Sequence, residues 1–105
     1  MLHKRKIDDV QWVPQATLDL PVDFFRTKRG IEFHEGNDDL DHFVGSDLMD
    51  AEGREFILRH YPGYPTGTVT VYLPFELSSA SEIEDAIGTI LHQLAVPTSA
   101  VRWRR

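Results

Sequence analysis

The chain has 105 residues, no cysteine and a formal net charge of −6, and its length is typical of one domain. The missing cysteine excludes disulfides, thiolate nucleophiles and Cys-ligated zinc, and it is typical of proteins in a reducing cytosol. The charge is segregated: residues 30–99 hold 13 Asp/Glu and two Arg, a net −11, whereas residues 1–29 and 100–105 hold nine Lys/Arg and four Asp/Glu, a net +5.

The N-terminus is basic at residues 4–6 and turns acidic at Asp8 and Asp9, where a secretory signal would continue into an apolar run. No stretch of the sequence reaches the ~18 apolar residues of a membrane span. We therefore expect a single soluble domain over residues 1–105, located in the cytoplasm and without a membrane partner.

The first elements are short. Residues 10–13, which stand directly before Pro14, predict a short strand. Residues 18–25 are either a short helix that begins near Pro21 or an extended segment. The sequence does not decide between these two alternatives.

The acidic middle of the chain predicts a hairpin. Residues 30–34 alternate in polarity, Gly36-Asn37 is a turn signal, and residues 40–44 are the second arm. Residues 47–53 then predict a turn that leads into the next strand.

The C-terminal half has stronger local signals. Residues 54–61 and 68–73 are rich in β-formers, and the six residues between them contain two prolines and two glycines. This pattern predicts an antiparallel hairpin. A final strand is predicted over residues 100–105, with Val101 and Trp103 on one side and the arginines on the other.

A helix is predicted over residues 81–95. Its start carries two overlapping capping boxes, Ser79 to Glu82 and Ser81 to Glu84. Apolar side chains then recur at helical spacing: Ile83, Ile87, Ile90, Leu91 and Leu94. The predicted fold is therefore α+β: an antiparallel sheet of four to six strands with one C-terminal helix packed on a face, followed by a last strand.

The large aromatic side chains exceed what one helix seated on a sheet would cover. They are Trp12, Phe24, Phe25, Phe43, Phe75 and Trp103. Together with the segregated charge, this surplus predicts a homodimer.

The densest group of potential metal ligands has two histidines and four carboxylates: His34, Glu35, Asp38, Asp39, Asp41 and His42. Its spacing matches neither His-Glu-x-x-His nor a calcium loop, which needs Gly at the sixth position and Glu at the twelfth. We expect an acidic turn that faces water, and no metal or other cofactor. His34 and His42 stay as candidate ligands because a hairpin places them on neighbouring strands.

Catalytic and nucleic-acid signals are also incomplete. Gly45-Ser46-Asp47 lacks the second glycine of a nucleophile elbow, and no phosphate-binding loop occurs. Basic residues cluster at 4–6, 26–29 and 102–105, but the sequence pI of about 5.2 disfavours a nucleic-acid partner. We therefore assign no catalytic residue and expect a protein that is not an enzyme.

Two tyrosines lie at the turn between the C-terminal strands, Tyr61 just before it and Tyr64 in its middle. Tyrosine is enriched in interface hot spots because it combines a large contact area with a polar tip. The alternative is that one ring covers an edge of the core. The candidate partner-binding residues are Glu35, Asp38, Asp39, Asp41, Asp47, Tyr61 and Tyr64.

In size, acidity, lack of cysteine and mixed strand–helix plan, the chain resembles the small orphan proteins encoded in bacterial integron gene cassettes. That resemblance implies an accessory or binding role. We expect a non-enzymatic protein that recognises a basic protein partner through an acidic face around residues 35–55. The alternative is a small-molecule-binding protein or small enzyme with a helix–sheet pocket, in which His34, His42 or His60 would supply acid–base or metal chemistry.

Overall fold

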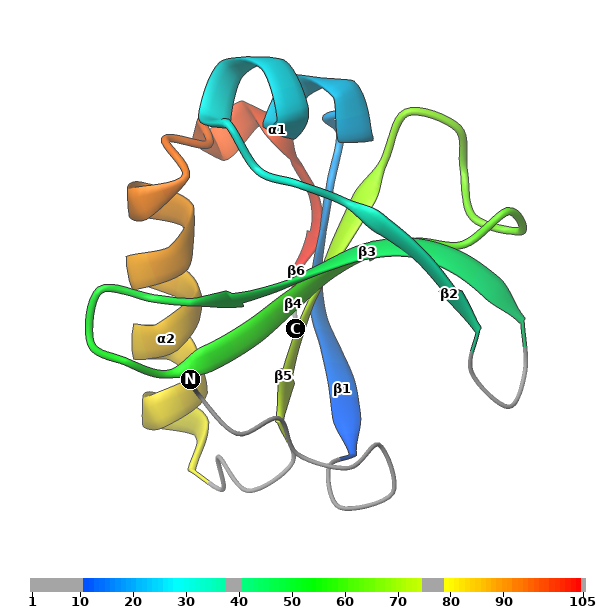
Figure 1. Ribbon diagram of the computed structural model, residues 1–105. Helices are drawn as coiled ribbons and strands as arrows, with labels where there is room; N and C mark the ends of the chain where they lie inside the picture. The colour runs from blue at the N-terminus through cyan, green and yellow to red at the C-terminus, as the bar shows by residue number, and fades with distance from the viewer. Residues whose placement is uncertain (1–10, 38–40, 75–78, 105) are drawn as a thin grey trace.

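The computed structural model describes residues 11–37, 41–74 and 79–104. These residues form one antiparallel sheet of six strands with two α-helices, so the predicted α+β fold is confirmed (Figure 1). The strands are β1 (Trp12–Leu18), β2 (His34–Asn37), β3 (His42–Met49), β4 (Glu55–His60), β5 (Val69–Pro74) and β6 (Val101–Arg104). The helices are α1 (Val22–Arg29) and α2 (Ala80–Gln93), and a 3-10 turn, Thr98–Ala100, precedes β6.

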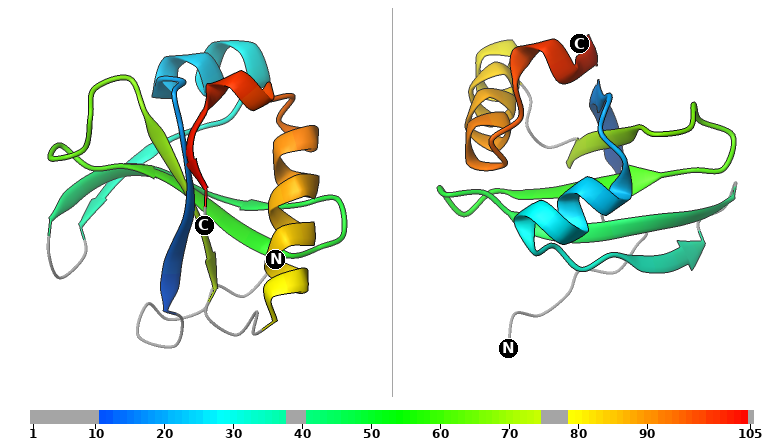
Figure 2. Two further views of the ribbon diagram at one scale, coloured as in Figure 1. Left: turned by 180° about the vertical axis from the view of Figure 1, so that it is seen from behind. Right: turned by 90° about the horizontal axis from the view of Figure 1, so that it is seen from above.

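The strand order across the sheet is β2-β3-β4-β5-β1-β6. Helix α2 runs alongside the sheet, and α1 lies across one end of it (Figures 1 and 2). Both helices contribute to one buried apolar cluster with the sheet. Its fully buried members include Ala16, Leu18, Phe25, Leu58, Val69, Val71, Ala86 and Ile90.

Side chains that alternate with these core residues point to the other face of the sheet, which we call the second face. The strand register places Ile57 opposite Tyr72 and Thr17 opposite Thr70 there, outside the helix-covered cluster. The Thr17 and Thr70 hydroxyls lie 3.0 Å apart across the two strands. The two faces therefore differ in chemistry: one is apolar and covered by helices, whereas the other carries hydroxyl groups and tyrosine.

Strand β1 corrects the first predicted element, because it begins at Trp12 and continues through Pro14 to Leu18. The register shifts between Pro14 and Ala16, and β6 pairs with β1 only from Ala16 onward. Proline is tolerated at such a bulge, where the ladder on one side is missing.

The region after β1 adopts the helical alternative. Pro21 precedes α1, Asp23 lies in its first turn and basic residues lie in its last, as the helix dipole favours. Gly30 ends the helix in the left-handed conformation, at φ 66°.

The hairpin of β2 and β3 exists, but its predicted turn is wrong. Gly36 and Asn37 lie inside β2, where they pair with Phe43 and His42. The expected turn over residues 47–53 is shorter as well, because β3 continues to Met49. Asp47 therefore lies in a strand.

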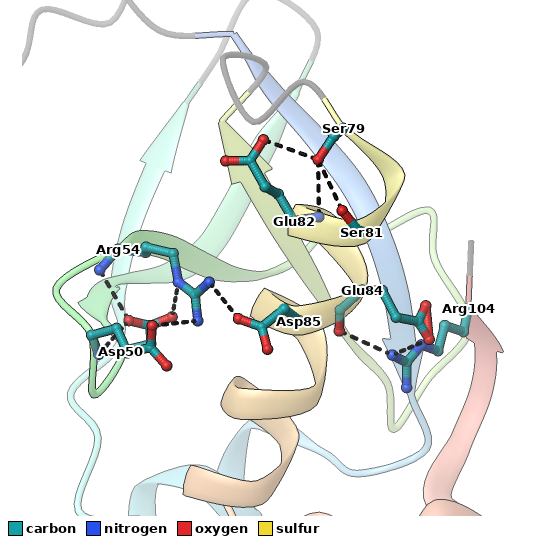
Figure 3. A network of polar contacts seen from close by, with 9 residues as sticks. Asp50, Arg54, Ser79, Ser81, Glu82, Glu84, Asp85 and Arg104 are labelled. Carbon is teal, nitrogen blue, oxygen red and sulfur yellow. Dashed lines mark hydrogen bonds and ion pairs between the residues drawn. The ribbon is translucent and has the colours of Figure 1, made fainter.

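The connection from β3 to β4 is built around a buried carboxylate. The side chain of Asp50 is fully buried and accepts the Glu52 and Arg54 backbone N–H groups at 2.8 and 3.0 Å. It also accepts Arg54 Nε at 2.7 Å, while Arg54 Nη1 donates to Asp85 of α2 at 3.0 Å (Figure 3). One carboxylate thus closes the turn and orients the arginine that ties it to α2.

The C-terminal predictions hold with small shifts. The β4–β5 hairpin and the strand β6 are present. Helix α2 is capped by Ser79, whose Oγ accepts Glu82 N–H at 3.1 Å (Figure 3). The sides predicted for β6 are wrong, because the register shifts between Leu18–Val101 and Thr17–Trp103. Val101 packs against the core, whereas Trp103 pairs with Thr17 and is 44% exposed.

Arg29 joins the C-terminal ends of the two helices. Its Nε donates to Leu94 O at 2.6 Å and its Nη2 to Ala95 O at 3.2 Å, so it satisfies carbonyls that a helix end leaves free. We expect Arg29→Met to lower the free energy of unfolding by about 1–2 kcal/mol, since two charge-assisted hydrogen bonds are lost. Urea denaturation is the measurement, with Lys28→Met as the matched control on an exposed neighbour. An equal loss in both variants would contradict the role given to Arg29.

Candidate partner-binding site

Five side chains form an aromatic cluster near one end of the sheet. They are Phe43, Arg59, Tyr61, Tyr64 and Tyr72. Phe43 comes from β3, Arg59 from β4, Tyr72 from β5, and both other tyrosines from the segment between β4 and β5. Segments distant in sequence therefore build one surface.

The Tyr61 ring lies at the centre of the aromatic cluster. Its centroid is 5.5 Å from Phe43, 5.3 Å from Tyr64 and 6.5 Å from Tyr72. The Arg59 guanidinium lies 3.9 Å from the Phe43 centroid and donates to Tyr61 Oη at 3.0 Å. The stacking and the hydrogen bond hold the guanidinium in one orientation. Its side chain would therefore lose little further conformational entropy when a partner binds.

Two glycines of the neighbouring hairpin make room for these side chains. A Cβ at Gly36 would lie 2.8 Å from Phe43 Cζ, and one at Gly45 would lie 2.9 Å from Arg59 Cγ and 3.0 Å from Leu58 O. These separations are shorter than van der Waals contact. The Phe43 ring lies over Gly36, so this position of β2 needs a residue without a side chain. The glycine therefore serves ring packing within a strand, and its interpretation as a turn residue was wrong.

The hydroxyl groups of Tyr64 and Tyr72 lie 3.2 Å apart. Burial raises the pKa of Tyr72 far above its ordinary value, and the hydrogen bond with Tyr64 adds to this effect. Tyr72 therefore stays neutral at physiological pH. Tyr64 is 38% exposed and carries the accessible end of this pair.

The predicted acidic residues do not share one face. Glu35 pairs with Val44 on β3 and Asp47 pairs with Ile57 on β4, so the alternation places them on opposite faces of the sheet. Asp41 lies directly before β3, and its Oδ1 accepts the His42 backbone N–H at 2.7 Å. Asp38 and Asp39 lie outside the described residues.

The two candidate metal ligands are on neighbouring strands, as expected, but they do not converge. His34 pairs with Gly45, whereas His42 pairs with Asn37, so the two imidazoles lie on opposite faces and several residues apart. His42 Nε2 is 3.6 Å from Glu35, and His34 Nε2 is 3.9 Å from Glu32. Among residues 11–37, 41–74 and 79–104, no group of three or more potential ligands gathers.

The space between α2 and the sheet is occupied by apolar side chains such as Leu58 and Ile87. The three histidines considered for a pocket there are each at least partly exposed on the strands β2, β3 and β4: His34, His42 and His60. His60 Nδ1 donates a hydrogen bond to the Thr68 backbone carbonyl at 2.9 Å. None of them lies in the buried cluster.

Sequence reasoning singled out Tyr61 and Tyr64 but missed Phe43, Arg59 and Tyr72. The missed signal was the alternation along β4 and β5. Arg59 follows the buried Leu58 and Tyr72 follows the buried Val71, so Arg59 and Tyr72 lie on the opposite face of the sheet. That signal carries no information about which strand lies next to which.

No family model, no curated protein and no solved structure matches the chain. Within the part of the chain that the structure describes, no helix is both long and apolar enough to cross a membrane.

Proposed function

We propose that this protein is a non-enzymatic binding protein, and that a protein partner binds at the end of the sheet where the aromatic cluster meets the β2–β3 hairpin. The observation that supports it most is the aromatic cluster itself. Tyr61 and Tyr64 lie together with an oriented arginine, and this is the side-chain chemistry that dominates interface hot spots.

The charge of the chain supports a basic partner. The net charge is −6, Asp47 lies on the same face of the sheet as the aromatic cluster, and Glu35 lies on the opposite face of the neighbouring hairpin. Carboxylates around an aromatic centre increase the association rate with a positively charged surface and disfavour acidic competitors. The homodimer, the cytoplasmic location and the resemblance to integron-cassette proteins stay predictions.

We expect Tyr64→Ala to raise the dissociation constant of the partner complex about tenfold or more, because Tyr64 is the exposed ring of the aromatic cluster. The partner is first captured from a lysate of the source organism on immobilised wild-type protein and identified by mass spectrometry. Its affinity for each purified variant is then measured by isothermal titration calorimetry.

Trp103→Ala is the matched control, because Trp103 is similarly exposed but lies on the opposite edge strand, β6. The proposed function is contradicted if Tyr64→Ala binds like the wild type, or if Trp103→Ala loses as much affinity.

A further inference from the structure

We infer that the partner binds by strand addition: an extended segment of alternating basic and apolar residues pairs with the open edge of β2. This inference rests on the proposed function, because it specifies how the partner reaches the same end of the sheet. Three independent observations support it: the geometry of the edge, a hollow beside it and the charge along it.

The first observation is that β2 is a regular edge strand. It stands first in the strand order, and within the described ranges only β3 pairs with it. Its four residue pairs run from His34–Gly45 to Asn37–His42 without a register shift. An edge strand of this kind leaves backbone N–H and C=O groups on its outer side for another chain.

The opposite edge, β6, is protected by contrast. Its pairing with β1 is interrupted by a register shift. Its arginines are engaged, Arg102 with Asp19 at 2.7 Å and Arg104 with Glu84 at 3.1 Å. A bulge is a usual means of blocking an edge, so β2, whose described pairing has no bulge, is the better site for strand addition.

The second observation is a shallow surface hollow beside the start of β2. It is lined by Arg26, Gly30, Ile31, Glu32, Phe33 and His34. Phe33 is buried and Ile31 partly buried, so the hollow has apolar side chains next to the edge. A strand added along β2 that extends past His34 would run beside this hollow.

The third observation is the charge along the edge. The Glu35 and Glu32 side chains are 78% and 89% exposed, and the one arginine at the hollow is already 3.6 Å from Asp23. A second copy paired through β2 would place two acidic edges side by side, which like-charge repulsion disfavours. A partner with Lys or Arg opposite Glu35 avoids this repulsion.

The alternation of β2 sets the pattern of the added strand. Glu35 and Asn37 point to one face, whereas His34 and Gly36 point to the other, where the Phe43 ring lies over Gly36. Basic residues on one face of the added strand therefore lie beside Glu35, and apolar residues on its other face lie beside Phe43.

The test uses a blocked eight-residue peptide of alternating arginine and valine, followed by NMR of the isotope-labelled full chain. We expect chemical-shift changes at residues 31–37 and slower hydrogen exchange of β2 amides. A glutamate–valine peptide and an arginine peptide with N-methylated valines are expected not to bind, because one has the wrong charge and the other has lost strand donors. Glu35→Lys is expected to raise the dissociation constant roughly fivefold. The control is Glu52→Lys, the same charge change on an exposed residue at the far turn.

The inference is overturned if the arginine–valine peptide does not bind, if its N-methylated form binds equally well, or if Glu52→Lys weakens binding as much as Glu35→Lys. Shift changes confined to residues 61–64 and 72 would also overturn it and leave the proposed function standing. Failure of the proposed function is recognised separately, by the Tyr64→Ala and Trp103→Ala measurements on the captured partner.

Discussion

Asp50→Asn is expected to lower the free energy of unfolding by about 3 kcal/mol, because it removes the acceptor charge from a buried, fully hydrogen-bonded carboxylate. Asp50 accepts two backbone N–H groups and Arg54 Nε, and Arg54 in turn reaches Asp85 on α2. The substitution removes the nearest counter-charge of the guanidinium and weakens the link to the helix. Chemical denaturation at pH 7 is the measurement.

Glu52→Gln is the matched control, since it neutralises a mostly exposed carboxylate on the same turn, 3.9 Å from Arg54. We expect it to change stability by less than about 0.5 kcal/mol, as exposed ion pairs do. Equal effects of the two variants would contradict the role assigned to Asp50.

The same carboxylate gives a pH dependence with a defined sign. Burial alone would raise the pKa of Asp50, but hydrogen bonds from the backbone and side chain of Arg54 and from the Glu52 backbone outweigh it, so the pKa lies below its ordinary value of 3.8. A lowered folded-state pKa adds stability above the unfolded value, and this is lost as pH falls through the folded value. The stability difference between wild type and Asp50→Asn is therefore expected to be constant near neutral pH and to shrink below about pH 4.

Phe25→Ala is expected to lower the free energy of unfolding by about 3–5 kcal/mol, the range for removing a fully buried phenylalanine. Phe25 is the fully buried residue of α1, with 0% of its surface exposed, and it packs in the cluster that α2 and the sheet share. Its loss leaves a cavity where α1 closes the end of the core. Thermal and urea denaturation measure the effect.

The neighbouring Phe24→Ala is the control, because it makes the same substitution on the same helix at a partly buried position. We expect Phe24→Ala to lower the free energy of unfolding by less than half as much as Phe25→Ala. This holds although the Arg29 guanidinium carbon lies 4.9 Å from the Phe24 ring centroid and the Phe24 ring packs edge-on against Phe25. A larger loss at Phe24 would show that α1 is held through its outer side and not through Phe25.

The C-terminal half was predictable because its signals are local. Prolines and glycines at 62–67 fix the turn between β4 and β5. Ser79 caps α2 by accepting the backbone N–H of Glu82, only three residues further along the chain. In the N-terminal half the local signals misled. Gly36 resembles a turn residue, but it is needed in β2 because the Phe43 ring occupies the space of its side chain.

The candidate site was predictable only in part. Tyr61 and Tyr64 stood out beside the turn, yet the contact of Tyr61 with Phe43 and Tyr72 depends on three strands lying next to each other. The acidic face was also expected from composition alone. The strand register decides instead which face each carboxylate occupies. Glu35 pairs with Val44 and Asp47 pairs with Ile57, so the two carboxylates lie on opposite faces of the sheet.

The sequence by itself determined the fold class, the β4–β5 hairpin, the capped helix and the final strand, because periodicity, caps and turn residues act within a few positions. Only the tertiary structure decided the strand order, the bulge that turns Trp103 away from Val101, and the position of β2 as the first strand of the described sheet. The physical reason is that strand pairing and register are set by contacts between residues far apart in the chain, whose energies no local pattern records.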